Sequence, residues 1–325
     1  MRARIKHSIP FLIIACVVVA KYYSPGSVYP SLGIQRIILN NKKAVAPIRL
    51  LDSSQIIEDL RFLSSDSCAG RQPGTKGHFL SAERILLRFR ETGVDSFNNS
   101  LVQKFSGKER NGSKEGKNII GWTRGTKYPE KYIVISAHYD HIGKTATGEI
   151  YHGASDNASG AACLLAIAKF FNQHPQPYSL IFAAFDREES GFEGSFYFVN
   201  DPMSTAHHPV IKFNLNIDMI ARNDKNEIFA CGIIHYPFLA YLVKEIQTKT
   251  NVKLLMGHDK GKNREDWTRL SDHFPFHLKR IPFLYIGTED HPDYHKPSDT
   301  FDKIDLGTYI ENCNMVALLA EIIKI

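Results

Sequence analysis

The sequence has few cysteines, and none of them is close to another. Its 325 residues contain five, which are Cys16, Cys68, Cys163, Cys231 and Cys313. Their spacing excludes a zinc knuckle and a dithiol redox pair. A chain of this length does not need disulfides, because it can bury a large core. We therefore expect Cys163 and Cys313, which lie in apolar helical segments, to be buried small hydrophobes, with a disulfide from Cys68 as the open alternative.

The sequence also has no large excess of charge of one sign. The chain has 40 lysine and arginine residues against 34 aspartate and glutamate residues, a formal net charge of +6. Arg2, Arg4 and Lys6 supply half of this excess, and residues 1–20 contain no acidic residue. Such a balance does not indicate the basic surface of a nucleic-acid-binding protein, so we expect no nucleic-acid partner.

The apolar run near the N-terminus is too short to cross a bilayer comfortably. Residues 9–20 form a run of roughly 12 residues behind a basic start. This pattern is typical of an export signal, and we expect cleavage after Ala20 and a periplasmic or secreted protein. A lipoprotein-type cleavage site at Cys16, an uncleaved anchor that associates with a membrane through residues 9–20, and a buried N-terminal helix are the alternatives.

The remaining chain lacks internal repeats and low-complexity tracts. Residues 21–50 contain proline and glycine turns without a sustained hydrophobic period, which indicates a linker. Residues 51–325 have the length and the ordinary apolar content of one large domain. We therefore predict an export signal or anchor at residues 1–20, a linker at 21–50 and a single catalytic domain at 51–325.

Apolar strand-like segments alternate with helical ones through this domain. Strands are predicted at residues 101–105, 117–122, 132–138, 179–185, 210–217, 227–231 and 281–287. Helices are predicted at residues 54–63, 77–92, 158–171, 237–248 and 306–323, with a shorter one around 195–198. The polar residues 107–116 are expected to form a loop. This alternation predicts an α/β fold with a mainly parallel or mixed sheet between two layers of helices.

Side chains with metal-binding chemistry follow these predicted strands. They are two imidazoles and three carboxylates, namely His138, Asp156, Glu189, Asp218 and His295. The carboxyl ends of parallel strands meet at one edge of a sheet, and this mixture of ligands suits zinc in a hydrolytic site. Five protein ligands are too many for one catalytic zinc ion, which keeps an open position for water. We therefore expect two zinc ions per chain that share one carboxylate.

The order of these residues resembles that of the co-catalytic di-zinc aminopeptidase family, which also contains glutamate carboxypeptidases and animal-type glutaminyl cyclases. The resemblance extends from about Ser53 to Ile325 and includes the Ala69-Gly70-Arg71 turn and the segment 118–121. It implies a zinc-exopeptidase fold, which is similar to the phosphorylase/hydrolase-like fold, and a peptide substrate. No confident role follows from it for Arg71.

The resemblance also implies how the five ligands are divided. His138 and Asp218 would bind one zinc ion, Glu189 and His295 would bind the other, and Asp156 would bridge them. The peptide bond between Asp156 and the next residue is often cis in this family. Three further histidines, His141, His152 and His291, lie near the expected site but are not among the expected ligands.

Three more residues receive catalytic roles from the same resemblance. Glu188 would be the general base that takes a proton from the bridging water and passes it to the leaving amine. Tyr294 would donate a hydrogen bond to the oxyanion, and Asp140 would orient the imidazole of His138. Each residue taken alone also has an ordinary structural explanation, such as a solvated pair of glutamates or a helix cap. The prediction depends on their joint occurrence in this order.

We therefore expect an exported, zinc-dependent exopeptidase, and specifically an aminopeptidase. A glutaminyl cyclase is the first alternative, although such enzymes use a single zinc ion and this chain keeps all five ligands. A carboxypeptidase or dipeptidase is the second, because the differences lie in pocket loops such as residues 256–275. A catalytically inactive, receptor-like binding domain is the third, although such a protein would be expected to lose Glu188 or the ligands. The oligomeric state is not predicted.

Overall fold

The computed structural model describes residues 46–201, 210–222, 225–260 and 265–324. The predicted signal or anchor at residues 1–20, with Cys16, lies outside the described residues, as does most of the predicted linker. Within the described residues no helix is both long enough and apolar enough to cross a membrane. The chain from Ala44 to Ile325 forms one compact unit.

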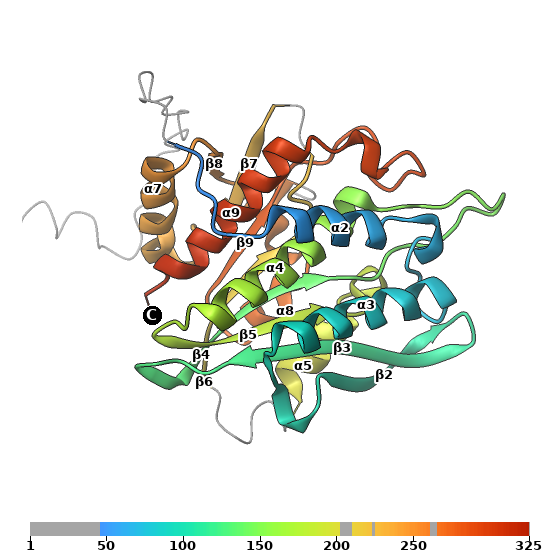
Figure 1. Cartoon of the computed structure of the whole chain (residues 1–325), viewed down its shortest axis with the longest axis horizontal. Coiled ribbons are helices and arrows are strands. Elements are labelled where there is room, and N and C mark those ends of the chain that lie inside the picture. Colours follow the sequence, from blue (N-terminus) through green and yellow to red (C-terminus); the bar gives the residue numbers. More distant parts are fainter. Residues whose placement is uncertain (1–45, 202–209, 223–224, 261–264, 325) are drawn as a thin grey trace, which may run out of the picture. The chain divides into compact units, whose positions relative to one another are not determined.

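The described residues contain nine strands that form one mixed sheet (Figure 1). The strands are β1 (Asp95–Ser96), β2 (Val102–Arg110), β3 (Ser113–Thr123), β4 (Tyr128–His138), β5 (Tyr178–Phe185), β6 (Val210–Ile217), β7 (Glu227–Cys231), β8 (Lys253–Met256) and β9 (Phe283–Gly287). Their order across the sheet is β1-β3-β5-β4-β6-β9-β7-β8, with β2 paired to β3. The four central strands, β5, β4, β6 and β9, run parallel to one another.

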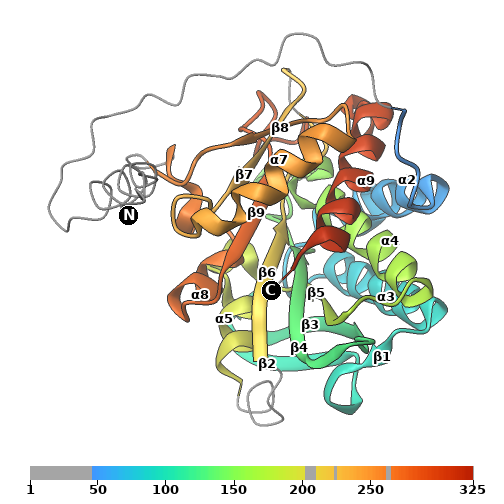
Figure 2. The ribbon, with the colours of Figure 1, turned by 90° about the vertical axis from the view of Figure 1, so that its left-hand side faces the viewer.

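Helices cover both faces of this sheet, which confirms the predicted α/β architecture. They are α2 (Ser53–Leu63), α3 (Lys76–Thr92), α4 (Gly160–Gln173), α5 (Glu193–Asn200), α7 (Ala240–Lys249), α8 (His273–Leu278) and α9 (Leu306–Ile322). Figure 2 shows α2, α3, α4 and α9 on one side of the central strands and α5 and α8 on the other. The two-layer prediction is therefore correct.

Alternation along the central strands builds a core on each face. Ile133 and Ile135 of β4 belong to the larger core beneath α4, whereas Val134 between them belongs to the smaller core with Phe198 of α5 and Phe276 of α8. All five side chains are essentially inaccessible to solvent. A strand that is buried on both faces reads as a continuous apolar run, which is why β4 was visible in the sequence.

The sheet differs from the prediction in its shorter and more polar parts. Residues 107–116 are not a loop, because β2 continues to Arg110, β3 begins at Ser113, and only a two-residue turn separates them. β2 lies at the edge of the sheet, and the part of β3 before Ile119 pairs with β2 but not with β5. Polar side chains can face solvent there, so their polarity misled the loop prediction. The two-residue β1 and the four-residue β8 were not predicted.

The cysteines and the N-terminal lead-in have plain structural roles. Cys68, Cys163, Cys231 and Cys313 are free and buried, so the disulfide alternative for Cys68 is wrong. The end of the predicted linker, residues 46–50, has no regular structure. The side-chain oxygen of Asn314 accepts hydrogen bonds from the backbone amides of residues 50 and 51, which attaches this lead-in to α9.

Candidate functional site

The candidate site lies at the carboxyl ends of the four parallel strands. His138 is the last residue of β4, Glu188 and Glu189 follow β5, and Asp218 follows β6. The segment after β9 supplies His295. A cavity of about 70 Å³ at this edge is lined by His138, Asp156, Glu188, Glu189, Asp218, Met219, Trp267, Leu270, Tyr285, Thr288, Asp290, Tyr294 and His295. Tertiary structure thus brings the five expected ligands together.

The carboxylate of Asp156 lies between two histidines. Its Oδ1 atom is 3.4 Å from Nε2 of His138, and its Oδ2 atom is 3.0 Å from Nε2 of His295. Asp218 Oδ1 lies 3.3 Å from the same atom of His138, and Glu189 Oε1 lies 3.5 Å from the same atom of His295. Each oxygen of Asp156 therefore faces a different imidazole, and each of these imidazoles also lies beside a second carboxylate, which is the arrangement expected of a bridging ligand.

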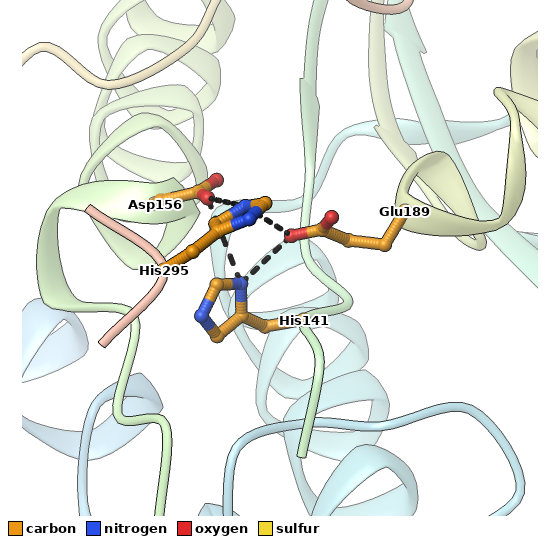
Figure 3. A group of neighbouring side chains, drawn as sticks. All are labelled: His141, Asp156, Glu189 and His295. Carbon is orange, nitrogen blue, oxygen red and sulfur yellow. Dashed lines mark hydrogen bonds and ion pairs between the residues drawn. The ribbon is translucent and has the colours of Figure 1, made fainter. Parts of the chain in front are cut away.

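Two groups of candidate ligand atoms can be distinguished within the site. His138, Glu188 and Asp218 form one group, and His141, Asp156, Glu189 and His295 form the other, with the ligand atoms of each group within 4.8 Å of one another. The second group is drawn in Figure 3. His141 is a member that the sequence analysis did not place among the ligands.

Two side chains, those of Asn157 and Asp299, fix the turn that carries Asp156. The peptide bond from Asp156 to Asn157 is cis, as the family resemblance implied. The Asn157 side chain donates to the carbonyl of Ile217 at the end of β6 and accepts a hydrogen bond from the amide of Met219. The carboxylate of Asp299 accepts hydrogen bonds from the amides of residues 155 and 156. Asn157 thus connects the turn to the strand end that carries Asp218.

Arg71 holds the same turn from the other side, a role that the sequence did not reveal. Its side chain is completely buried. It donates to the carbonyl oxygens of Leu63, Tyr139, His152, Gly153 and Asp156, at distances of 2.7 to 3.1 Å. These acceptors come from three separate segments, so one guanidinium joins the end of α2, the end of β4 and the turn that carries Asp156.

Asp140 contacts both the first histidine and the glutamate pair. Its Oδ1 accepts a hydrogen bond from the amide of Glu188 at 2.9 Å, and its Oδ2 accepts one from the amide of Glu189 at 3.3 Å. His138 Nδ1 lies 3.2 Å from the carbonyl oxygen of Asp140 and 3.7 Å from its carboxylate. The buried carboxylate therefore positions the turn after β5 in addition to lying beside His138.

The electrostatics of the site favour added positive charge. Burial alone would lower the pKa of His295, but its hydrogen bonds to Asp156 and Glu189 raise this pKa to about 10. Burial also opposes protonation of His138, yet the charges of Glu188 and Asp218 raise the pKa of this histidine well above its usual value. Burial is the main cause that raises the pKa of Glu188, and the neighbouring carboxylates add to it. The carboxylates therefore outweigh the cost of burying a cation.

No lysine or arginine side chain of the described residues forms a salt bridge with the site carboxylates of Asp156, Glu188, Glu189 or Asp218. Arg71 interacts electrostatically with Asp156, but its hydrogen bonds go to carbonyl oxygens. Oxygen and imidazole nitrogen at these separations are suitable ligands for divalent zinc. The donor set therefore fits two divalent cations.

The aromatic residues around the site complete the cavity. The ring of Tyr294 stacks on His295, with centroids 3.9 Å apart. Burial, together with the charges of Asp156 and Glu189, raises the pKa of Tyr294, so its hydroxyl keeps its proton. Trp267 and Leu270, from the segment between β8 and α8, also line the cavity.

The other two nearby histidines do not join either group. His152 lies 2.9 Å from the carboxylate of Asp66 and is partly exposed. His291 is buried, and its Nε2 atom lies 3.8 Å from Asp299. That these two histidines are not ligands stays a prediction.

A mixed sheet with a histidine and carboxylate cluster at its parallel strand ends is the architecture of a metal-dependent hydrolase. The sequence model of Peptidase family M28 matches residues 118–320. Since this match includes more than half of the chain, the protein belongs to Peptidase family M28, and the resemblance drawn from the sequence is confirmed.

Curated relatives include peptidases of more than one specificity. Aminopeptidase YwaD of Bacillus subtilis (strain 168) is 27% identical over 197 residues, which are 58% of this chain and 40% of the relative. The Glutamate carboxypeptidase 2 homolog of Caenorhabditis elegans is 24% identical over 192 residues, 56% of this chain and 23% of the relative. The chain thus spans less than half the length of these relatives.

Solved structures with the same fold are also of two kinds. The LapA aminopeptidase of Legionella pneumophila has a TM-score of 0.65 at 20% identity, with 87% of this chain and 77% of that chain covered. The glutaminyl cyclase of Fimbriiglobus ruber has a TM-score of 0.68 at 21% identity, with 88% and 100% covered. At these identities the likeness establishes the zinc-exopeptidase-like fold and not the reaction.

Proposed function

We propose that this protein is a zinc-dependent aminopeptidase that removes the N-terminal residue of peptides. The observation that carries the proposal is the arrangement of the five candidate ligands, with each oxygen of Asp156 facing a different histidine that also lies beside a second carboxylate. This arrangement suits two zinc ions that share one carboxylate, and membership of Peptidase family M28 supports a peptide substrate.

The charges around the cavity favour an amino terminus over a carboxyl terminus. Among the described residues that line the cavity there is no lysine or arginine, whereas five are aspartate or glutamate. A peptide carboxylate would meet like charge there and would lack the bidentate partner that arginine provides. An α-ammonium group would meet opposite charge. This contrast supports an aminopeptidase rather than a carboxypeptidase.

Glu188 is the residue that we assign to proton transfer. Zinc bound at the site would polarise the scissile carbonyl and lower the pKa of a water molecule. Glu188 lines the same cavity, and its raised pKa makes it a stronger base than an exposed glutamate. It would take a proton from the attacking water and transfer this proton to the leaving nitrogen as the carbon–nitrogen bond breaks.

Two neighbours would support this step. Tyr294 keeps its proton and lies beside His295, where its hydroxyl could donate to the oxygen that becomes negative in the transition state. Asp140 accepts the amide hydrogens of both Glu188 and Glu189 and would hold the base and its neighbour in place. We assign Asp140 a positioning role for this reason.

The test combines metal analysis with hydrolysis of Leu-4-nitroanilide by wild type, Glu188→Gln and Glu311→Gln. Wild type should contain about two zinc ions per chain and release nitroaniline. Glu188→Gln should keep its zinc but lose at least about 100-fold in kcat, because general-base catalysis contributes this much. Glu311, exposed on α9, is the matched control, and its variant should act like wild type. If neither variant lost zinc-dependent hydrolysis, this result would contradict the proposal.

Glutaminyl cyclisation is the second candidate function, because glutaminyl cyclases share this fold at TM-scores as high as those of aminopeptidases. Incubation with a peptide that begins with glutamine separates the two reactions. Cyclisation releases ammonia and leaves the peptide bond intact, whereas an aminopeptidase releases free glutamine. One zinc ion per chain together with ammonia release would replace the aminopeptidase proposal by the cyclase.

We also propose that the protein is exported, on the strength of residues 1–20 alone. Fractionation of cells that express the full chain, and of cells that express a chain lacking these residues, tests this proposal. The full chain is expected outside the cytoplasm and the shortened chain inside it. Equal distribution of the two would contradict export.

A further inference from the structure

His141 is buried in the candidate site although nothing in the expected ligand set requires a histidine there. It follows the end of β4, and its side chain is 1% exposed. Figure 3 shows its imidazole pointing toward Glu189 and toward the oxygen of Asp156 that also faces His295. A buried polar group is costly unless it has a partner, so this imidazole needs a structural or chemical reason.

The distances around His141 lie on either side of those between ligands of one tetrahedral ion. Nδ1 of His141 lies 2.8 Å from Glu189 Oε1 and 3.7 Å from Asp156 Oδ2. The corresponding distances from Nε2 of His295 to these oxygens are 3.5 and 3.0 Å. Atoms that bind one zinc ion at about 2.0 to 2.1 Å stand roughly 3.3 Å apart in a tetrahedron. The two imidazoles therefore face the same pair of oxygens from two sides.

The backbone holds His141 in this place. Its amide donates to the carbonyl oxygen of Arg71 at 3.2 Å. The side chain of Arg71 in turn bonds the carbonyls of Tyr139 and Asp156. A single residue therefore fixes the segment that carries His141 and the turn that carries Asp156, which keeps the imidazole and the carboxylate at a defined separation.

We propose that His141 is a fourth protein ligand of the zinc ion expected between Asp156, Glu189 and His295. This inference rests on the proposed zinc site and adds a ligand to it. The other zinc position would then have three protein ligands, namely His138, Asp156 and Asp218. Four protein ligands are typical of a closed structural position, and three are typical of a position that is open to water. The two positions would thus differ in affinity, with the His141 position the tighter one.

A hydrogen bond alone is the competing explanation, since His141 Nδ1 is within hydrogen-bond distance of Glu189. Two variants separate the explanations. Asparagine at this place keeps an N–H group near the position of Nδ1 but is a poor zinc ligand, whereas alanine removes both properties. His152→Asn is the matched control, because His152 lies in the same connection after β4 but outside both ligand groups.

The experiment measures zinc stoichiometry and affinity by competition with a chromophoric chelator. If His141 is a ligand, His141→Asn and His141→Ala should both weaken one of the two zinc ions by more than about 100-fold, beyond the 10- to 100-fold that loss of an outer partner causes. His152→Asn should bind both ions as wild type does. If His141 only donates a hydrogen bond, His141→Asn should keep both affinities and only His141→Ala should lose affinity, which would overturn the inference.

X-ray absorption at the zinc edge of the wild-type protein gives a readout that needs no variant. Three imidazoles distributed over two zinc ions support His141 as a ligand, and two imidazoles contradict it, even if the variants do not fold. A wild-type protein that binds no zinc would instead refute the proposed function together with this inference. Two zinc ions with two imidazoles would leave the proposed function intact and reject His141 alone.

Discussion

Two groups of acidic side chains, each with buried members, balance their charge in different ways. In the first, which we call the α2–α3 cluster, Asp59 and Glu58 of α2 contact Arg84 and Arg88 of α3 at 2.7 to 2.9 Å. In the second, the candidate site, the carboxylates of Asp156, Glu188, Glu189 and Asp218 have no lysine or arginine salt-bridge partner among the described residues.

The comparison shows what a surplus of buried carboxylate indicates. A carboxylate taken out of water is stable only when it is paired and hydrogen bonded. The α2–α3 cluster supplies its cations from the chain itself and therefore has a structural role. The candidate site draws positive charge onto its histidines instead, and an external divalent cation would supply this charge directly. The two regions therefore differ more in the partners of their carboxylates than in the number of carboxylates.

The largest expected effect comes from breaking the α2–α3 cluster at its buried acid. Asp59 is completely buried, and Asp59→Asn leaves two guanidinium groups of low exposure without a buried counter-charge. We expect a loss of about 3 kcal/mol or more in the free energy of unfolding. Urea denaturation measures this loss, and zinc content should be unchanged. A variant as stable as wild type would show that the cluster does not need its buried carboxylate.

Removal of metal tests the candidate site, which is the second region of the comparison. Dialysis against a chelator should lower the melting temperature, and zinc at about 100 times its Kd should restore about 2.7 kcal/mol. Asp59→Asn should show the same zinc-dependent increment, because distant perturbations add. Scanning calorimetry of both proteins, with and without zinc, checks this expectation. An increment that disappears in the variant would mean that the two regions are coupled.

A buried histidine extends the comparison to the stability of the protein at acid pH. His273 of α8 is completely buried, and burial lowers its pKa from 6.5 to about 3. The folded protein therefore favours neutral His273, whose contribution to stability is complete above pH 6.5 and is lost as the pH falls toward 3. At pH 5 the loss should be about 2 kcal/mol.

His273→Gln keeps an N–H group that can donate to the carbonyl of Trp267 but does not titrate. Urea denaturation between pH 5 and pH 8 should show a smaller slope of stability against pH for this variant than for wild type. Equal slopes would mean that His273 is not a source of the acid sensitivity.

The smallest effect is expected at the exposed acid of the α2–α3 cluster. Glu58 contacts the same two arginines as Asp59, but its side chain is 61% exposed. Glu58→Gln should cost less than about 1 kcal/mol, because solvent screens an exposed ion pair. Measured beside Asp59→Asn, it isolates burial as the variable. Equal losses in the two variants would contradict this explanation.

Much of the fold was readable because its central strands are buried on both faces. The predicted segments 179–185 and 210–217 differ from β5 and β6 by at most one residue at either end. The polar hairpin of β2 and the start of β3 gave no such signal, so residues 107–116 were assigned to a loop. The short β8 was missed because four residues are too few for a pattern to stand out.

The sequence by itself determined which strand ends carry most of the candidate ligands, because His138, Glu189 and Asp218 lie at or shortly after the ends of apolar runs that must be buried. Only the tertiary structure decided which of these side chains share a neighbour. Arg71 and Asn157 act on backbone groups of distant segments, and His141 lies beside Glu189 and Asp156 only after the chain has folded. Hydrogen bonds and ligand distances between remote segments have no local periodicity, so no stretch of sequence records them.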